Sequence, residues 1–136
     1  MSLELCILAS GSSGNCAALR TPAGVMLIDA GLGPRTTAQR MNGTGIALKD
    51  IRAICLTHLD RDHFNPNCLG ALVSRGIRVH CHRSRVEFLI ELLGDDAAAL
   101  ISGFEDDFEP LEGVCVRTIL LAHVRAGSHG FVVSVD

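Results

Sequence analysis

Short apolar segments alternate with helix-like segments along this chain, and that alternation limits its fold more than any other feature. Residues 51–56 form a strand-like apolar run, and a helix is predicted over residues 66–75, with Asn65 as its N-cap and Gly76 at its end. Residues 77–81 are the next predicted strand. Strands that alternate with helices favour an α/β architecture.

An early hairpin changes this expectation from a purely parallel sheet to a mixed one. Residues 16–20 and 25–29 read as two strands on either side of the turn sequence Thr21-Pro22-Ala23-Gly24. Two strands joined by so short a turn are antiparallel. We therefore predict a single α/β (α+β) domain over residues 1–136, built on a mixed sheet.

The other segments agree with this architecture. Pro34 suits the first turn of a helix, and Ser84 with Glu87 forms the S-x-x-E pattern of a capping box. The acidic run at residues 105–107 predicts a solvated loop. The remaining predicted elements are strands at residues 3–9, 114–122 and 131–135 and helices at residues 34–41 and 84–93.

Composition excludes several classes of protein. The 136 residues are 48% hydrophobic and 20% charged with a net charge of −3, so the chain is globular and has no basic tract of a dedicated nucleic-acid-binding module. The first residues do not resemble a signal peptide, and no apolar run reaches the roughly 18 residues of a membrane span. We therefore expect a cytoplasmic protein with no membrane partner. The six cysteines include no C-x-x-C pair, which favours reduced core thiols over disulfides.

The segment His58-Leu59-Asp60-Arg61-Asp62-His63 is the part of the chain that points to chemistry. It places four potential metal ligands, two His and two Asp, between a buried strand and a helix. Imidazole and carboxylate suit zinc, manganese or iron, and the lack of Cys disfavours a closed structural zinc site. The alternative is a polar loop in which Asp62 caps the next helix and Arg61 pairs with Asp60. The spacing favours a metal site over that loop.

This segment resembles the H-x-H-x-D-H signature of the metallo-β-lactamase-fold hydrolases, with Asp60 in place of the second His. Leu27-Ile28-Asp29-Ala30-Gly31 resembles the preceding strand of that superfamily, which ends in Asp-x-Gly. The opening Leu8-Ala9-Ser10-Gly11-Ser12-Ser13-Gly14-Asn15 is similar, more specifically, to the YycJ (WalJ) branch. His123, before Gly130-Phe131-Val132-Val133, stands where the family has its next ligand His. The resemblance covers nearly the whole chain.

The resemblance implies the N-terminal half of an αββα sandwich that binds divalent metal, Zn or Mn, with up to two ions in a complete site. Asp62 is the expected catalytic residue, and Asp29 would hydrogen-bond the signature loop and orient its ligands. In the family, a water activated by the metals attacks an ester, amide or phosphodiester bond. The ligands implied at the first ion are His58, Asp60 and His123, and those at the second are Asp62 and His63.

Three departures from the family pattern bear on activity. Asp60 brings an anionic oxygen where the family has a neutral imidazole, which shifts the preference toward harder ions such as manganese. Val124 stands where the branch has Asp after its ligand His. The bridging carboxylate and the final His of the family come from the second half of the fold, and nothing after Asp136 supplies them. We therefore expect a truncated chain or a natural fragment that self-associates, for example as a dimer, through exposed strands.

Two hypotheses for function follow. The first is a metal-dependent hydrolase that attacks a phosphodiester, in a nucleic-acid or small-molecule substrate, with a small-ester or lactone hydrolase as the related alternative. The second is an incomplete half-domain that binds metal weakly or not at all, and we expect the 136-residue chain to be inactive alone. His80, His82 and His129 are further candidates to replace a missing ligand, although a structural role is favoured for each.

Overall fold

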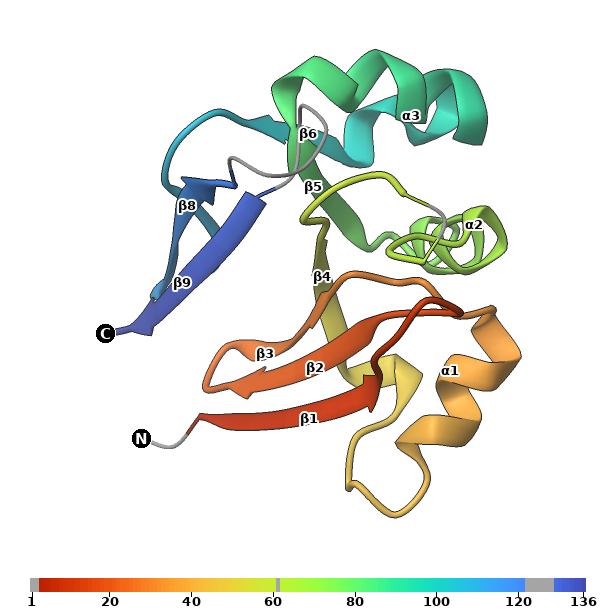
Figure 1. Cartoon of the computed structure of the whole chain (residues 1–136), viewed down its shortest axis with the longest axis vertical. Coiled ribbons are helices and arrows are strands. Elements are labelled where there is room, and N and C mark those ends of the chain that lie inside the picture. The colour runs from red at the N-terminus through yellow and green to blue at the C-terminus, as the bar shows by residue number, and fades with distance from the viewer. Residues whose placement is uncertain (1–2, 61, 122–128) are drawn as a thin grey trace.

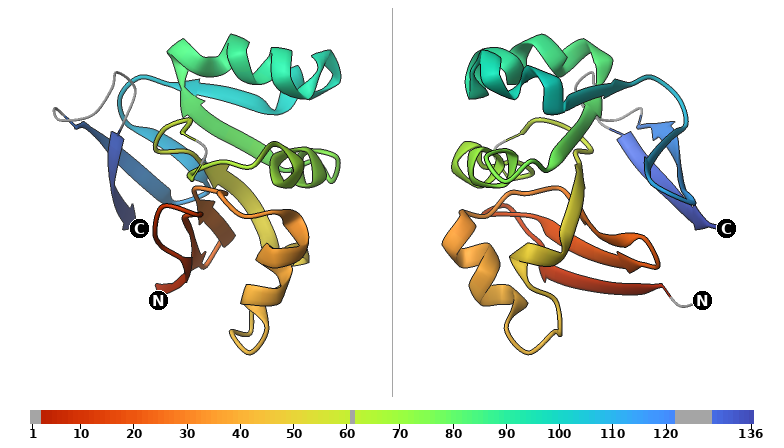
Figure 2. Two further views of the ribbon diagram at one scale, coloured as in Figure 1. Left: turned by 45° about the vertical axis from the view of Figure 1, so that its right-hand side comes forward. Right: turned by 180° about the vertical axis from the view of Figure 1, so that it is seen from behind.

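The computed structural model of the protein describes residues 3–60, 62–121 and 129–136. It contains a six-stranded sheet and a three-stranded sheet. The helices lie on one side of the larger sheet, and the smaller sheet lies on the other side (Figure 1). Two further views show the same three layers (Figure 2).

The larger sheet is mixed, as the hairpin pattern predicts. Its first three strands are antiparallel, and its last four are parallel, with the third strand shared between the two parts. Gly24 forms the turn of the hairpin with a φ of 126°, a backbone conformation that favours glycine. In order across the sheet the strands are β1 (Glu4–Ala9), β2 (Cys16–Thr21), β3 (Gly24–Ile28), β4 (Ile51–Cys55), β5 (Arg78–His82) and β6 (Ile101–Phe104).

Each α-helix begins close to where the sequence predicts it. Asn65 caps the second helix, because its side-chain oxygen accepts hydrogen bonds from the main-chain N–H groups of Asn67 (3.0 Å) and Cys68 (3.1 Å). Gly76, just after this helix, has a φ of 84°. The helices are α1 (Pro34–Met41), α2 (Pro66–Val73) and α3 (Val86–Leu93), and the 3-10 turns are η1 (Leu48–Asp50), η2 (Arg83–Arg85) and η3 (Asp95–Leu100).

The capping box predicted at Ser84 and Glu87 is wrong. The chain forms η2 after β5, α3 starts only at Val86, and its N-cap residue Arg85 makes no side-chain cap. Ser84 is engaged with the last residue of β5, because its main-chain N–H donates to Nδ1 of His82 (3.2 Å). The side chain that caps this turn therefore comes from the preceding strand.

The smaller sheet contains two of the predicted strands and one that the sequence patterns do not indicate. It consists of β7 (Phe108–Leu111), β8 (Val114–Leu120) and β9 (His129–Val135), all antiparallel. β7 and the sixth strand of the larger sheet have four residues each and lie on either side of the acidic loop at residues 105–107. Segments this short are too brief to show the alternation by which strands are predicted.

The central strands of the larger sheet are buried on both faces. On one face the helices contribute Met41, Leu69 and Leu89 to the larger core cluster. On the other face Met26 and Ala53 pack against Val114 of the smaller sheet. This packing explains why β3 and β4 are almost continuously apolar rather than alternating.

The cysteines are free thiols, four of them buried: Cys16, Cys55, Cys68 and Cys81. Cys6 is half-buried, and Cys115 is exposed on β8, so the prediction of a core position is wrong for Cys115. Its neighbours Val114 and Val116 point into the core, and side chains alternate between the two faces of a strand. In the part of the chain that the structure describes, no helix is long and apolar enough to cross a membrane.

Candidate metal centre

The candidate site lies where the neighbouring parallel strands β3 and β4 end. Ile28 and Cys55 are register partners, so the residues that follow them leave the sheet at the same edge. The loop after β4 is fastened to the loop after β3 by main-chain hydrogen bonds from Ala30 N to His63 O (2.8 Å) and from Asn65 N to Ala30 O (2.6 Å). The sheet thus fixes the backbone on which the signature residues stand.

Asp29 connects the two loops through its side chain. Its carboxylate accepts hydrogen bonds from the main-chain N–H of Thr57 (2.8 Å) and from Nδ1 of His63 (2.6 Å), and the residue is only 5% exposed. Among the described residues other than glycine, only Asp29 has a positive φ, at 63°. A non-glycine residue in this region is strained, and such strain persists where surrounding contacts hold it. The strained backbone therefore places this carboxylate under the signature loop.

The contact with Asp29 fixes the tautomer of His63. A carboxylate can only accept, so Nδ1 of His63 must carry the hydrogen, and the lone pair of the neutral ring is on Nε2. This Nε2 lies 3.3 Å from Oδ2 of Asp62. A carboxylate that orients a His in this way is the usual support of a metal-binding imidazole.

His58 lies directly beside His63, with the two ring centroids 3.7 Å apart. Its Nδ1 is 3.0 Å from Oγ1 of Thr57. Burial, and after it the neighbouring His63, lowers the pKa of His58, although the acidic side chains nearby act in the opposite direction. The lowered pKa favours the neutral imidazole, which is the form that binds metal.

The structure brings three of the five predicted ligands together. His58, Asp62 and His63 each offer one ligand atom, and these atoms lie within 4.8 Å of one another. Asp60 is not in this group: its side chain is 54% exposed, and its Oδ2 lies 3.4 Å from Nε2 of His58. His123 is outside the described residues. Two imidazoles and a carboxylate, all partly buried, are a donor set that fits a divalent ion such as zinc.

Asn15 also belongs to the site, although the sequence alone does not predict a role for its side chain. Its Nδ2 lies within hydrogen-bond distance of the carbonyl oxygen (3.1 Å) and of Oδ2 (3.0 Å) of Asp62, and also of the carbonyl oxygen of Gly11 (2.8 Å). The main-chain N–H of Asn15 donates to the carbonyl of Asp62 as well. The sequence shows an Asn at the end of the first Ser/Gly loop, but only the fold shows that its side chain contacts Asp62.

Gly31 allows the two loops to approach this closely. A Cβ at this position would overlap the carbonyl group of Asp62 and lie 2.8 Å from the main-chain nitrogen of Asn15. The glycine of the Asp-x-Gly pattern is therefore needed for space beside the signature loop.

The other three His candidates stand outside the ligand group. His80 is buried between the two sheets, where its ring stacks on Phe108 (5.4 Å) and its Nε2 has no hydrogen-bond partner among the described residues. His82 and His129 stack on each other with centroids 4.9 Å apart. The main-chain N–H of His129 donates to the carbonyl of Thr57 (2.9 Å), so β9 reaches the residue that precedes His58.

A known protein family matches the sequence of this chain. Residues 9–133 match the sequence profile of the metallo-β-lactamase superfamily. The chain belongs to the metallo-β-lactamase superfamily. The superfamily inferred from the signature and the mixed-sheet fold predicted for it are therefore confirmed. No curated protein matches the sequence of this superfamily member.

Solved structures of the metallo-β-lactamase fold resemble the chain over almost its whole length. A B3 metallo-β-lactamase with an active-site glutamic acid has a TM-score of 0.71 at 19% identity, over 97% of this chain and 55% of that one. A Cronobacter sakazakii metallo-β-lactamase with a HARLDQ motif gives 0.68 at 23%, over 92% and 53%. A chemotaxis sensor with a peroxy diiron species gives 0.72 at 13%, over 95% and 54%. This chain thus spans about half the length of these proteins, and at these identities the likeness is one of fold.

Proposed function

We propose that this chain carries the metal-binding half of a metal-dependent hydrolase of the YycJ-like branch, with His58, Asp62 and His63 as its ligands. The observation that carries the proposal is the contact between Asp29 and Nδ1 of His63, which leaves the lone pair of Nε2 beside the Asp62 carboxylate. A buried carboxylate that bonds a His ring is the usual support of a metal-binding imidazole, and a loop that only caps a helix would not need it.

The chain's own residues divide the work at this centre. A divalent ion bound here supplies Lewis acidity and lowers the pKa of a water molecule. Asp29 holds the His63 ring in the tautomer that binds metal, and Asn15 fixes the Asp62 carboxylate by holding its Oδ2. Asp62 is then placed to orient the attacking water, which is the catalytic role we assign to it.

The substrate we propose is a phosphodiester. Support for it comes from the opening loop at residues 8–15, which resembles the YycJ-like branch, and Asn15 of that loop contacts Asp62. A small ester or a lactone is the alternative substrate, because the same fold carries several hydrolytic activities.

Asp60 bears on which metal is bound. The third residue of the signature here is Asp60 and not His. The HARLDQ motif of the Cronobacter enzyme also has a residue other than His at its third position. We propose that the Asp60 carboxylate, whose Oδ2 lies 3.4 Å from Nε2 of His58, becomes an additional ligand once His58 binds an ion, which would favour manganese over zinc because oxygen ligands prefer harder ions. Asp60→His should then move the preference toward zinc, and an unchanged preference would show that Asp60 is not a ligand.

Metal content tests the proposal directly. The chain is loaded with Mn²⁺ or Zn²⁺, dialysed and measured by elemental analysis, beside Asp62→Ala and the exposed control Asp96→Ala. We expect bound metal in the parent and in Asp96→Ala, and its loss in Asp62→Ala. No metal in the parent chain would overturn the site. Activity on bis-(p-nitrophenyl) phosphate and p-nitrophenyl acetate then separates phosphodiesterase from esterase function in a protein that contains both halves of the fold.

A further inference from the structure

The hydroxyl group of Thr57 lies between the buried carboxylate of the candidate site and its first imidazole. Its Oγ1 is 3.0 Å from Oδ1 and 2.8 Å from Oδ2 of Asp29, and it is 3.0 Å from Nδ1 of His58. Nδ1 of His63 lies farther from it, at 3.4 Å. A hydroxyl group has one hydrogen and two lone pairs, so the neighbour that receives this hydrogen decides the direction of the other bonds.

The carboxylate of Asp29 receives the hydroxyl hydrogen. A carboxylate can only accept, and without this hydrogen its two oxygens would face the lone pairs of Oγ1 of Thr57 at 3.0 Å and 2.8 Å. Oγ1 then has only lone pairs to offer His58, so Nδ1 of that ring must carry a hydrogen and donate it. The lone pair of the neutral His58 ring is therefore on Nε2, as it is in His63.

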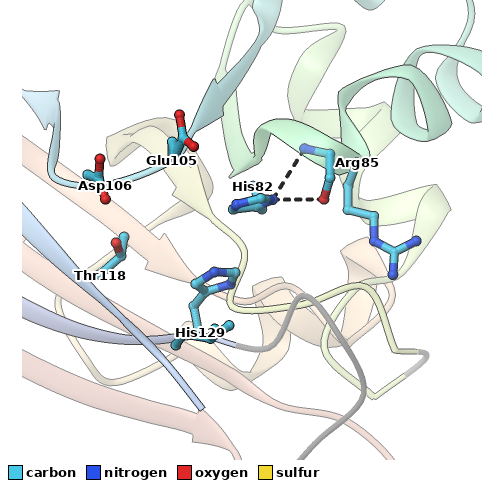
Figure 3. A pocket seen from close by; sticks show the side chains of 8 residues that line it. His82, Arg85, Glu105, Asp106, Thr118 and His129 are labelled. Atoms are coloured by element: carbon cyan, nitrogen blue, oxygen red, sulfur yellow. Dashed lines mark hydrogen bonds between the residues drawn. The ribbon is translucent and has the colours of Figure 1, made fainter. Parts of the chain in front are cut away.

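The main chain holds Thr57 in position for these contacts. Its N–H donates to Oδ1 of Asp29 (2.8 Å), and its carbonyl accepts from the N–H of His129 (2.9 Å). Figure 3 shows His129 beside His82 in the neighbouring pocket, and His129 is only 5% exposed. Thr57 is thus fastened both to the loop after β3 and to β9. Because a β-branched side chain has few χ1 rotamers, a fixed main chain also directs the hydroxyl group.

We propose that Thr57 is a positioning residue that carries the hydrogen-bond direction set by Asp29 to His58, so that one buried carboxylate fixes the tautomer of both rings. His63 is bonded by the carboxylate itself, whereas His58 is bonded through the hydroxyl group. We call the chain of contacts from Asp29 through Thr57 to His58 the hydroxyl relay. The tautomers belong to the metal-free chain, and the role of the relay in holding a metal rests on the proposed function.

NMR of the metal-free chain reads the tautomers directly. The chain is labelled in its His rings and kept in EDTA at about pH 8, where an ordinary His is neutral, and long-range proton–nitrogen spectra show which ring nitrogen carries the hydrogen. We expect the hydrogen on Nδ1 of both His58 and His63 in the parent. In Thr57→Val, which keeps the shape but lacks the hydroxyl group, His58 should populate both tautomers and His63 should stay unchanged.

Asp29→Asn tests the direction of the relay. An amide nitrogen in place of Oδ2 would donate to Oγ1 of Thr57 and release the hydroxyl hydrogen toward Nδ1 of His58. Both rings should then carry their hydrogen on Nε2, whereas Thr57→Val alters His58 alone. A changed His63 with an unchanged His58 in Asp29→Asn would refute the relay.

Metal affinity is the second measurement, made by competition with a chromogenic chelator. We expect Thr57→Val to bind Zn²⁺ about 10- to 100-fold more weakly, the loss found when a partner of a metal-binding His is altered. Thr57→Ser keeps the hydroxyl group and should restore most of the affinity. Thr36→Val, the same change in α1, is the matched control and should bind like the parent. An equal loss in Thr57→Ser and Thr57→Val would indicate packing and contradict the relay.

The two measurements separate this inference from the proposed function. An unchanged tautomer of His58 in Thr57→Val would overturn the relay, even if the parent chain bound metal. The expected tautomers in a parent chain that binds no metal would support the relay and overturn the proposed function.

Discussion

A single buried carboxylate controls the chemistry of the candidate site. Asp29 has a strained backbone, and the hydrogen bonds that hold it there also set the tautomer of His63. One residue therefore determines both the shape of the loop and the tautomer of a candidate ligand. Its removal should affect metal binding more than folding.

We predict that Asp29→Asn weakens metal affinity by about 10- to 100-fold, the range found when a partner of a metal-binding His is altered. Asn tolerates a positive φ, so the fold should be retained. Its amide can present an N–H to Nδ1 of His63 and stabilise the wrong tautomer. Competition with a chromogenic chelator measures the affinity, with Asp96→Asn as the control. Equal affinities in both variants would refute the role of Asp29.

His80 makes the stability of the protein depend on pH. The residue is 8% exposed, and no described residue bonds its Nε2. Burial, with a smaller effect of Arg78, lowers its pKa from 6.5 to about 4. The unfolded chain then binds a proton more readily than the folded chain between these two pH values. This contribution to stability is complete above pH 6.5, falls as the pH drops toward 4, and levels off below it.

We predict that His80→Phe reduces this pH dependence. The parent should lose about 3 kcal/mol of unfolding free energy through this group between pH 7 and pH 4, and the variant should lose correspondingly less. Phe also fills the space that stacks on Phe108 without a buried polar atom. Urea unfolding at pH 7.0, 5.5 and 4.0 measures the difference. Parallel curves for the two proteins would contradict the prediction.

At the scale of elements, the two loops after β3 and β4 are joined by main-chain hydrogen bonds and pack closely against each other. Gly31 lies against the main chain of Asp62, and Asn15 from the loop after β1 bonds the same residue. The position of Asp62 therefore depends on three segments that are distant in the sequence. Side chains added between them should displace the ligand.

We predict that Gly31→Ala destabilises the protein by about 1–3 kcal/mol, the usual cost of overpacking, and abolishes metal binding. Gly33→Ala is the matched control, because a Cβ there meets no atom within 4 Å and its φ is negative. Thermal unfolding and metal content are measured for both variants. If Gly31→Ala bound metal like Gly33→Ala, the close approach of the loops would not be needed for the site.

At the scale of the whole molecule, apolar side chains remain on the surface of the sheets. Leu5 and Ile7 on the edge strand β1 are 61% and 58% exposed, and Leu120 on β8 is 70% exposed. An unpaired, apolar edge strand is a surface on which chains associate. The self-association expected from the sequence thus remains a prediction, with β1 as the surface on which it depends.

We predict that the chain self-associates with rising concentration and that Leu5→Lys with Ile7→Lys shifts it toward the monomer. Charges on an edge strand oppose edge-to-edge pairing. Leu92→Lys on α3 removes an apolar side chain of 44% exposure elsewhere and should leave association unchanged. Sedimentation velocity at several concentrations gives the result. A monomeric parent at all concentrations would contradict it.

Much of the fold can be predicted from the sequence because its turns, helix caps and helix starts depend on residues that are close together in the chain. The turn around Gly24, the cap Asn65 and the helix over Pro34–Met41 each depend on neighbouring residues, and the structure confirms them. The capping box predicted at Ser84 does not form. Instead, Nδ1 of His82, the last residue of the preceding strand, accepts the main-chain hydrogen bond of Ser84.

The sequence by itself determined the alternating elements, the mixed sheet and a group of candidate ligands, because these follow from residue type and spacing. Only the tertiary structure decided that Asp29 holds His63, that Asn15 holds Asp62, and that Asp60 remains outside the ligand group. These contacts join segments far apart along the chain. Hydrogen-bond direction and burial, which set tautomer and pKa, arise only when such segments pack together.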